Sequence, residues 1–238
     1  MKKRLLPQID LVRAMPLSRI EKRALLQKVK FFRPTLTYRA VRAVTPDLFN
    51  VRPGCLEPTA SCWSEIANAI SSRCLHVAER IQNLAVGKRV FEDSTQRRLT
   101  GYQHQLFPLK IGISGGAVLW SDFYIVVDGV PVFPFIDPRR SNGLGPIARN
   151  VAFSLMHQRI RADGGDFASA EFAIYKFPSE GAESRRLSIH SSDGAELYSY
   201  DDLEQMIQEV YEVWEEVLSD REAEKRRAAG GRVGSLGI

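Results

Sequence analysis

The sequence predicts an α+β fold in which a mixed central sheet is flanked by helices. Two long stretches, 61–85 and 201–220, place apolar residues at the helical period. Between them, 121–140 resembles two short strands joined at Asp128-Gly129, a dipeptide that accepts the positive φ angles of a two-residue turn. With 238 residues, 44% of them hydrophobic and 26% charged, the chain can bury one substantial core.

Composition also limits the function classes. No apolar run is long enough to cross a bilayer, and Pro7 and Asp10 interrupt the start before a signal-peptide core can form, so we expect a cytoplasmic protein. The net charge of +5 permits a polyanionic partner without requiring one. Cys55, Cys62 and Cys74 are odd in number and lack a CxxC pair, which argues against a disulfide framework.

Residues 1–59 form a basic N-terminal extension, which we expect to be helical. They contain thirteen lysines and arginines against four acidic residues. Ser18 and Glu21 have capping-box spacing and open a helix that continues to about Phe32. We expect a strand over 35–44 and a connector from there to Pro58, because prolines and a glycine interrupt that stretch.

Residues 60–220 form the predicted core. Gly87 lies just past the end of the helix over 61–85, and a short strand is expected over 88–92, followed by a polar loop. Cys74 falls on the apolar stripe of this helix, so burial is favoured over a zinc site with Cys62 and His76.

The hairpin has a register that the Asp128-Gly129 turn sets. The expected opposite pairs are Val127 with Val130, Tyr124 with Phe133, and Asp122 with Phe135. Asp137 then lies diagonal to Asp122 on the same face. Two carboxylates are therefore expected together at the open end of an apolar hairpin. The alternative is that one acid ends a strand and the other turns the chain before Pro138.

After the hairpin, Pro146 opens a helix over 146–161 and a strand follows over 169–177. One face of this helix presents a polar row of Asn150, Ser154, His157 and Arg161. The helix over 201–220 has an acidic solvent face, and 221–238 is expected to be a flexible tail.

This order of elements, with Asp122 before the second strand and Ile136-Asp137-Pro138-Arg139 ending the third, resembles a degenerate form of the PD-(D/E)XK, restriction-endonuclease-like, nuclease superfamily. The resemblance covers about 61–177. It implies a metal-dependent phosphodiester hydrolase that acts on nucleic acid, with Asp122 and Asp137 as ligands of Mg²⁺ or Mn²⁺. Arg139 would occupy the position of the family's lysine; because arginine stays protonated, it would contact phosphate and not act as a base.

Cationic and polar side chains elsewhere supply the expected nucleic-acid contacts, and these are Asn150, His157, Arg161, Lys28, Lys30 and Arg33. The alternative is a catalytically inactive protein of this fold that binds nucleic acid or a protein partner as an adaptor or assembly subunit. The basic extension could equally dock on the acidic helix of its own chain, or on that of a neighbour in a homo-oligomer.

Overall fold

The computed structural model describes residues 5–29, 37–52, 61–112, 116–162, 164–181 and 184–230. Its helices are α1 (Gln8–Ala14), α2 (Arg19–Leu26), α3 (Arg39–Ala43), α4 (Thr45–Leu48), α5 (Trp63–Ser71), α6 (Val77–Gln96), α7 (Pro146–Met156) with its π-helical continuation η1 (His157–Arg161), the 3₁₀ turn η2 (Gly165–Phe167), and α8 (Tyr200–Gly230). Its strands are β1 (Val51–Arg52), β2 (Thr100–Gln103), β3 (Phe123–Val127), β4 (Val130–Asp137), β5 (Glu171–Lys176) and β6 (Ser188–Ser191).

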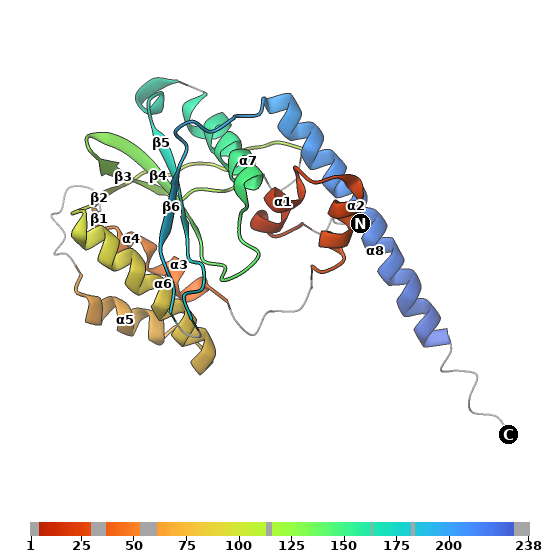
Figure 1. The fold of residues 1–238 in the computed structure, drawn as a ribbon, viewed down its shortest axis with the longest axis horizontal. Coiled ribbons are helices and arrows are strands. Elements are labelled where there is room, and N and C mark those ends of the chain that lie inside the picture. Colours follow the sequence, from red (N-terminus) through yellow and green to blue (C-terminus); the bar gives the residue numbers. More distant parts are fainter. Residues whose placement is uncertain are drawn as a thin grey trace.

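The six described strands form one mixed sheet in the order of the chain, with helices on both sides (Figure 1). The pairs β1–β2 and β4–β5 are parallel, and the other neighbours are antiparallel. Helices α3 to α6 cover one face, while α1, α2, α7 and α8 cover the other. The predicted α+β class, with a mixed sheet flanked by helices, is confirmed.

Strands β4 and β5 are buried on both faces. In β4, Phe133 packs into the core under α7 and α8, whereas Val132 and Ile136 pack into the core over α5 and α6. Strand β5 alternates in the same way, with Phe172 on one side and Tyr175 on the other. Two cores therefore share one sheet, because side chains alternate between faces along each strand.

The hairpin turn is confirmed. Asp128 and Gly129 have φ angles of 50° and 81°, and Val127 is opposite Val130 as predicted. The ladder between β3 and β4 ends at Ile125 and Val132, so the predicted pairs of Tyr124 with Phe133 and of Asp122 with Phe135 both lie outside it. Beyond that point β3 pairs with β2, and β4 pairs with β5.

Strand β4 is an interior strand although it contains two prolines, which remove ladder donors and are more usual in edge or bulged strands. Strand β4 lies between β3 and β5, with Pro131 opposite Val126 and Pro134 opposite Ala173. Pro134 has no N–H to donate and lies two positions beyond Val132, the last residue that pairs with β3. Burial on both faces stabilises this central position although ladder bonds are lost.

The helix predicted over 61–85 is two helices, α5 and α6, and the strand predicted over 88–92 lies inside α6. Gly87 suggested a helix end, but it is a packing position. A Cβ there would lie 2.7 Å from Cδ1 of Ile70 on α5, so a larger residue would require the Ile70 side chain to move. The strand that pairs with the hairpin is β2, in a stretch that we expected to be loop.

The strand predicted over 35–44 is also wrong in its described part, where α3 forms instead, and the stretch predicted as a connector begins with α4. The fully buried Asn83 of α6 accepts a hydrogen bond from the Val41 N–H (3.0 Å) and donates to the Thr37 carbonyl (2.7 Å). This tertiary contact overrides the local strand preference of the valines.

The basic N-terminal region docks on the acidic helix of its own chain, as one of the two alternatives proposed. Lys22 of α2, only 3% exposed, pairs with Glu209 of α8 at 2.6 Å, and Arg23 pairs with Glu216 at 2.8 Å. Arg19 also contacts Glu216. Helix α8 continues to Gly230, into the segment predicted as a tail; residues 231–238 lie outside the described part.

Candidate functional site

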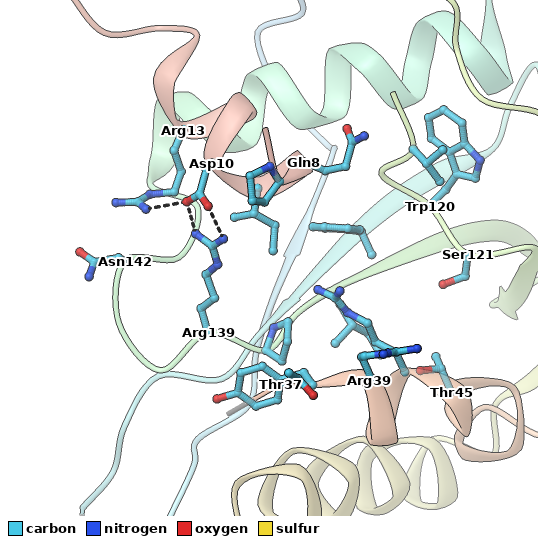
Figure 2. A pocket seen from close by; sticks show the side chains of 18 of the residues that line it. Gln8, Asp10, Arg13, Thr37, Arg39, Thr45, Trp120, Ser121, Arg139 and Asn142 are labelled. Atoms are coloured by element: carbon cyan, nitrogen blue, oxygen red, sulfur yellow. Dashed lines mark hydrogen bonds and ion pairs between the residues drawn. The ribbon is translucent and has the colours of Figure 1, made fainter. Parts of the chain in front are cut away.

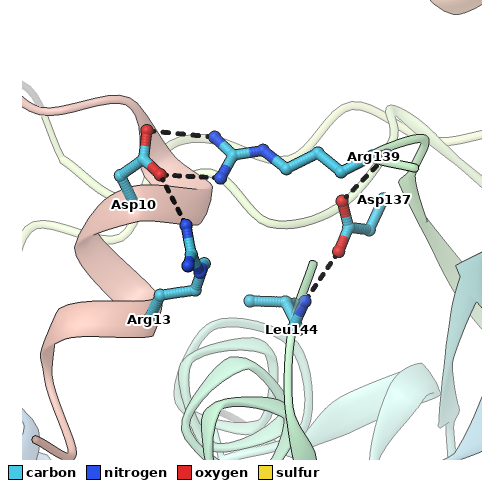
Figure 3. A network of polar contacts seen from close by, with 5 residues as sticks. All are labelled: Asp10, Arg13, Asp137, Arg139 and Leu144. Atoms are coloured by element: carbon cyan, nitrogen blue, oxygen red, sulfur yellow. Dashed lines mark hydrogen bonds and ion pairs between the residues drawn. The ribbon is translucent and has the colours of Figure 1, made fainter. Parts of the chain in front are cut away.

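The two predicted metal ligands have different environments. Asp122 is exposed just before β3, and Asp137 at the end of β4 is fully buried. The Asp137 carboxylate accepts hydrogen bonds from the Leu144 N–H (2.8 Å) and the Arg139 N–H (3.4 Å), as Figure 3 shows. Its oxygens therefore order the backbone between β4 and α7.

Arg139 forms an ion pair. Its two terminal nitrogens donate to the two carboxylate oxygens of Asp10 at 2.6 and 3.0 Å, and Arg13 donates to the same carboxylate at 3.3 Å (Figure 3). This bidentate contact fastens α1 to the segment after β4. Sequence reasoning missed Asp10, because it lies 129 positions from Arg139 and no local pattern connects them.

The polar row on α7 is not a continuous solvent-facing surface. Ser154 is fully buried, and its hydroxyl accepts a hydrogen bond from the Tyr198 N–H (2.9 Å). Arg161 donates to the Ala170 carbonyl (3.0 Å) and lies over the Phe172 ring. These contacts hold α7 against β5 and the start of α8.

The other members of the predicted nucleic-acid set are dispersed. Asn150 is half-buried. Burial, followed by the charge of Arg161, lowers the pKa of His157, and its buried Nδ1 has no hydrogen-bond partner among the described residues. Lys28 is exposed, whereas Lys30 and Arg33 lie outside the described residues.

A large cleft opens where β3 and β4 separate. It has a volume of about 1610 Å³, and its walls include Asp122 and Phe123 on the β3 side and Phe135 and Ile136 on the β4 side. Figure 2 shows Asp10 and Arg13 of α1 across the opening from Thr37 and Arg39. Within the described ranges, no three or more His, Cys, Asp or Glu side chains group closely enough to hold a metal ion.

A second feature is the segment 104–109, here called the Phe107 segment, which has no regular secondary structure apart from one bridge at its end. Its backbone is held at both ends and in the middle. The His104 N–H donates to the Asp122 carbonyl (3.0 Å), and Leu109 exchanges two hydrogen bonds with Ala117 (2.8 and 3.0 Å). Between them, Arg159 of η1 donates to the Phe107 carbonyl (2.7 Å).

The Phe107 side chain is 69% exposed, more than any other described aromatic residue. It projects from a backbone that is already ordered, so a partner could bury the ring at little cost in conformational entropy. We predicted no helix or strand for this stretch from the sequence. The available signal was an apolar Leu106-Phe107 pair directly after the polar run Gln103-His104-Gln105.

Comparison with known proteins identifies the chain. Residues 9–224 match the family described as the sliding clamp-binding bacterial toxin SocB. The chain belongs to this family. The DNA replication inhibitor toxin SocB of Caulobacter vibrioides (strain NA1000 / CB15N) is 32% identical to it over 232 residues, which cover 97% of each chain. No solved structure was found to match.

Membership of the SocB family overturns two interpretations from the sequence. The resemblance to PD-(D/E)XK nucleases is wrong, and so is the hydrolase acting on nucleic acid that it implied. The misleading signal was an order of elements that unrelated families share. The magnesium or manganese ion and the roles given to individual residues stay untested predictions. The division at residues 59 and 220 is likewise untested.

The protein-partner alternative agrees better with the SocB family. Its description names a protein, the sliding clamp, as what the toxin binds. No described helix is long and apolar enough to span a bilayer.

Proposed function

We propose that this protein binds a sliding clamp and inhibits DNA replication by doing so. The observation that supports this most strongly is the match to a clamp-binding toxin family from residue 9 to residue 224. That range begins in α1 and ends in α8, so it includes both cores and the cleft. Replication takes place in the cytoplasm, which is where such a toxin would act.

The Phe107 segment is the surface that we assign to the clamp. Binding energy in protein interfaces concentrates in a few anchors, often aromatic, that insert into pockets. Ile20 and Leu75 are more exposed, but they are aliphatic, and aliphatic anchors are less common in such contacts. Phe107 combines an aromatic ring with a fixed backbone on a loop, where binding residues are frequent.

The exposed area gives an expected magnitude. Since 69% of Phe107 is exposed and an aromatic side chain can bury roughly 200 Å², a clamp could cover about 140 Å². At ~25 cal/mol per Å² this corresponds to about 3 kcal/mol. Truncation to alanine leaves part of that area, so we expect Phe107→Ala to weaken binding by about 30-fold or more.

The test is a surface-binding measurement with immobilised sliding clamp from the bacterium that encodes the chain and, beside it, from Caulobacter vibrioides. The matched control is Leu75→Ala, an exposed apolar truncation before α6. We expect Phe107→Ala to lose binding and Leu75→Ala to retain it. If the unmodified protein binds neither clamp, the function is wrong. If Leu75→Ala is the weaker binder, only the assigned surface is wrong.

A further inference from the structure

The cleft between α1 and α3 contains cations that have no hydrogen-bonded or ion-paired partner among the described residues. The Asp10 carboxylate already forms ion pairs with Arg13 and Arg139. Arg39 and Arg42 of α3 and Lys28 also line the cleft, and within the described residues none of these three side chains makes a hydrogen bond or ion pair. The cleft therefore presents exposed positive charge along the wall that α3 forms (Figure 2).

Arg42 shows how the charges interact inside the cleft. Partial desolvation inside the cleft is the main effect and lowers the pKa of Arg42, although the residue stays exposed; Asp137 raises that pKa and Arg139 lowers it. The guanidinium thus lies in the field of Asp137 and Arg139, yet it has no described carboxylate in contact. Since Asp137 uses its oxygens on backbone N–H groups, an anion from outside would supply the missing partner.

Size and lining indicate the kind of anion. At about 1610 Å³ the cleft exceeds the roughly 300 to 1,000 Å³ of most small-molecule sites. Apolar side chains line its walls together with the cations, among them Leu17, Val118 and Phe135. A nucleic-acid backbone would meet Asp10, Glu21 and Asp122 along the same walls, which opposes a uniform polyanion.

We propose that this cleft binds an acidic and partly apolar segment of a partner protein, whose carboxylates pair with Arg39 and Arg42. Arginine suits this role because its planar guanidinium forms two parallel hydrogen bonds to one carboxylate. The site is separate from the Phe107 segment and does not depend on the proposed function: Phe107 is not part of the cleft wall. A protein with both surfaces can hold two protein partners.

The test uses the full chain and a fluorescently labelled peptide of alternating glutamate and leucine, with binding followed by anisotropy. A peptide in which glutamine replaces glutamate has the same shape without the charge. The test variant is Arg39→Glu with Arg42→Glu. The matched control is Arg80→Glu, an exposed position on α6 that does not line the cleft. Thermal unfolding of each variant checks that it is folded.

We expect the acidic peptide to bind, the double variant to weaken it about tenfold or more, and Arg80→Glu to leave it unchanged. Binding should also weaken as salt rises. Hydrogen exchange should slow at 39–43 and 118–122 when peptide is added. Equal binding of the glutamine peptide, or an unchanged affinity in the double variant, would refute the proposal.

Labelled duplex and single-stranded DNA test the alternative that the cleft binds a nucleic acid. Preferential binding of DNA, lost in the double variant, would replace the acidic protein segment by a nucleic acid and overturn the proposal. A clamp-binding measurement distinguishes this site from the surface assigned to the clamp. The double variant Arg39→Glu with Arg42→Glu should still bind the clamp, whereas Phe107→Ala should not. Loss of peptide binding in Phe107→Ala would also contradict two separate surfaces.

Discussion

Replacing Asp137 by alanine should destabilise the fold without changing its architecture. The carboxylate is fully buried and accepts the Leu144 N–H at 2.8 Å and the Arg139 N–H at 3.4 Å. Each buried N–H left without an acceptor costs about 1 to 3 kcal/mol, and the second bond is long, so we expect a total loss of about 2 to 4 kcal/mol.

Two further variants isolate the cause. Asp137→Asn keeps an acceptor for Leu144 and should lose less than half as much stability. Gly143→Ala should act through the same carboxylate, because an added Cβ would lie 2.7 Å from Oδ2 of Asp137 and displace it. Alanine at Gly145, where nothing lies within 4 Å of the added carbon, is the control.

Urea unfolding followed by tryptophan fluorescence measures these losses, since the buried Trp214 reports on the core. The slope with denaturant should stay constant while the midpoint falls. If Asp137→Ala changes the free energy of unfolding by less than about 0.5 kcal/mol, the backbone-ordering role of this side chain is refuted.

Three other outcomes are expected. Lys22→Ala should lower the free energy of unfolding, measured in urea, by about 2 to 3 kcal/mol, because each buried methylene contributes ~0.8 kcal/mol. Lys22→Met should lower it by less than half of that. The Lys22 hydrogen bond lowers the pKa of Glu209 from 4.5, so the pair stabilises fully above that pH and its contribution is lost as pH falls through the lowered pKa. The stability difference between wild type and Lys22→Met should therefore shrink in acid; a constant difference would contradict this. Gly101→Ala should destabilise by about 1 to 3 kcal/mol because its Cβ would lie 2.6 Å from Cγ2 of Val51, and a thermal melt equal to that of wild type would rule out this close approach.

Local chemistry predicted several elements well. The Asp128-Gly129 turn fixed the hairpin, because few dipeptides accept positive φ at both positions. Pro146 opens α7, and the apolar stripe of the last helix packs on the sheet core. In each case the determining residues are neighbours in sequence, so their pattern is sufficient.

Elements that depend on distant partners could not be predicted in this way. Asn83 imposes α3 on a stretch with strand-like composition. Gly87 lies inside α6 because Ile70 approaches it there, although a glycine at that spacing usually ends a helix. Both outcomes depend on the packing of one helix on another, which sequence periodicity does not record.

The candidate site shows the same division. The sequence pattern predicted that Asp137 and Arg139 lie at the end of a strand, and they do. It did not predict which residues they contact. Asp10 on α1 accepts hydrogen bonds from Arg139. The Leu144 N–H donates to the carboxylate of Asp137, which we expected to bind metal. Exposure of Phe107 is likewise a property of the folded chain, since half-buried and exposed phenylalanines look alike in a sequence.

DNA synthesis in living cells tests the central claim most directly. Production of the protein in the bacterium that encodes it would be induced, and incorporation of labelled thymidine would be followed for the unmodified chain, Phe107→Ala and Leu75→Ala. The account predicts that the unmodified chain and Leu75→Ala stop incorporation while Phe107→Ala, at equal protein level, does not. Continued synthesis in the presence of the unmodified chain would contradict it.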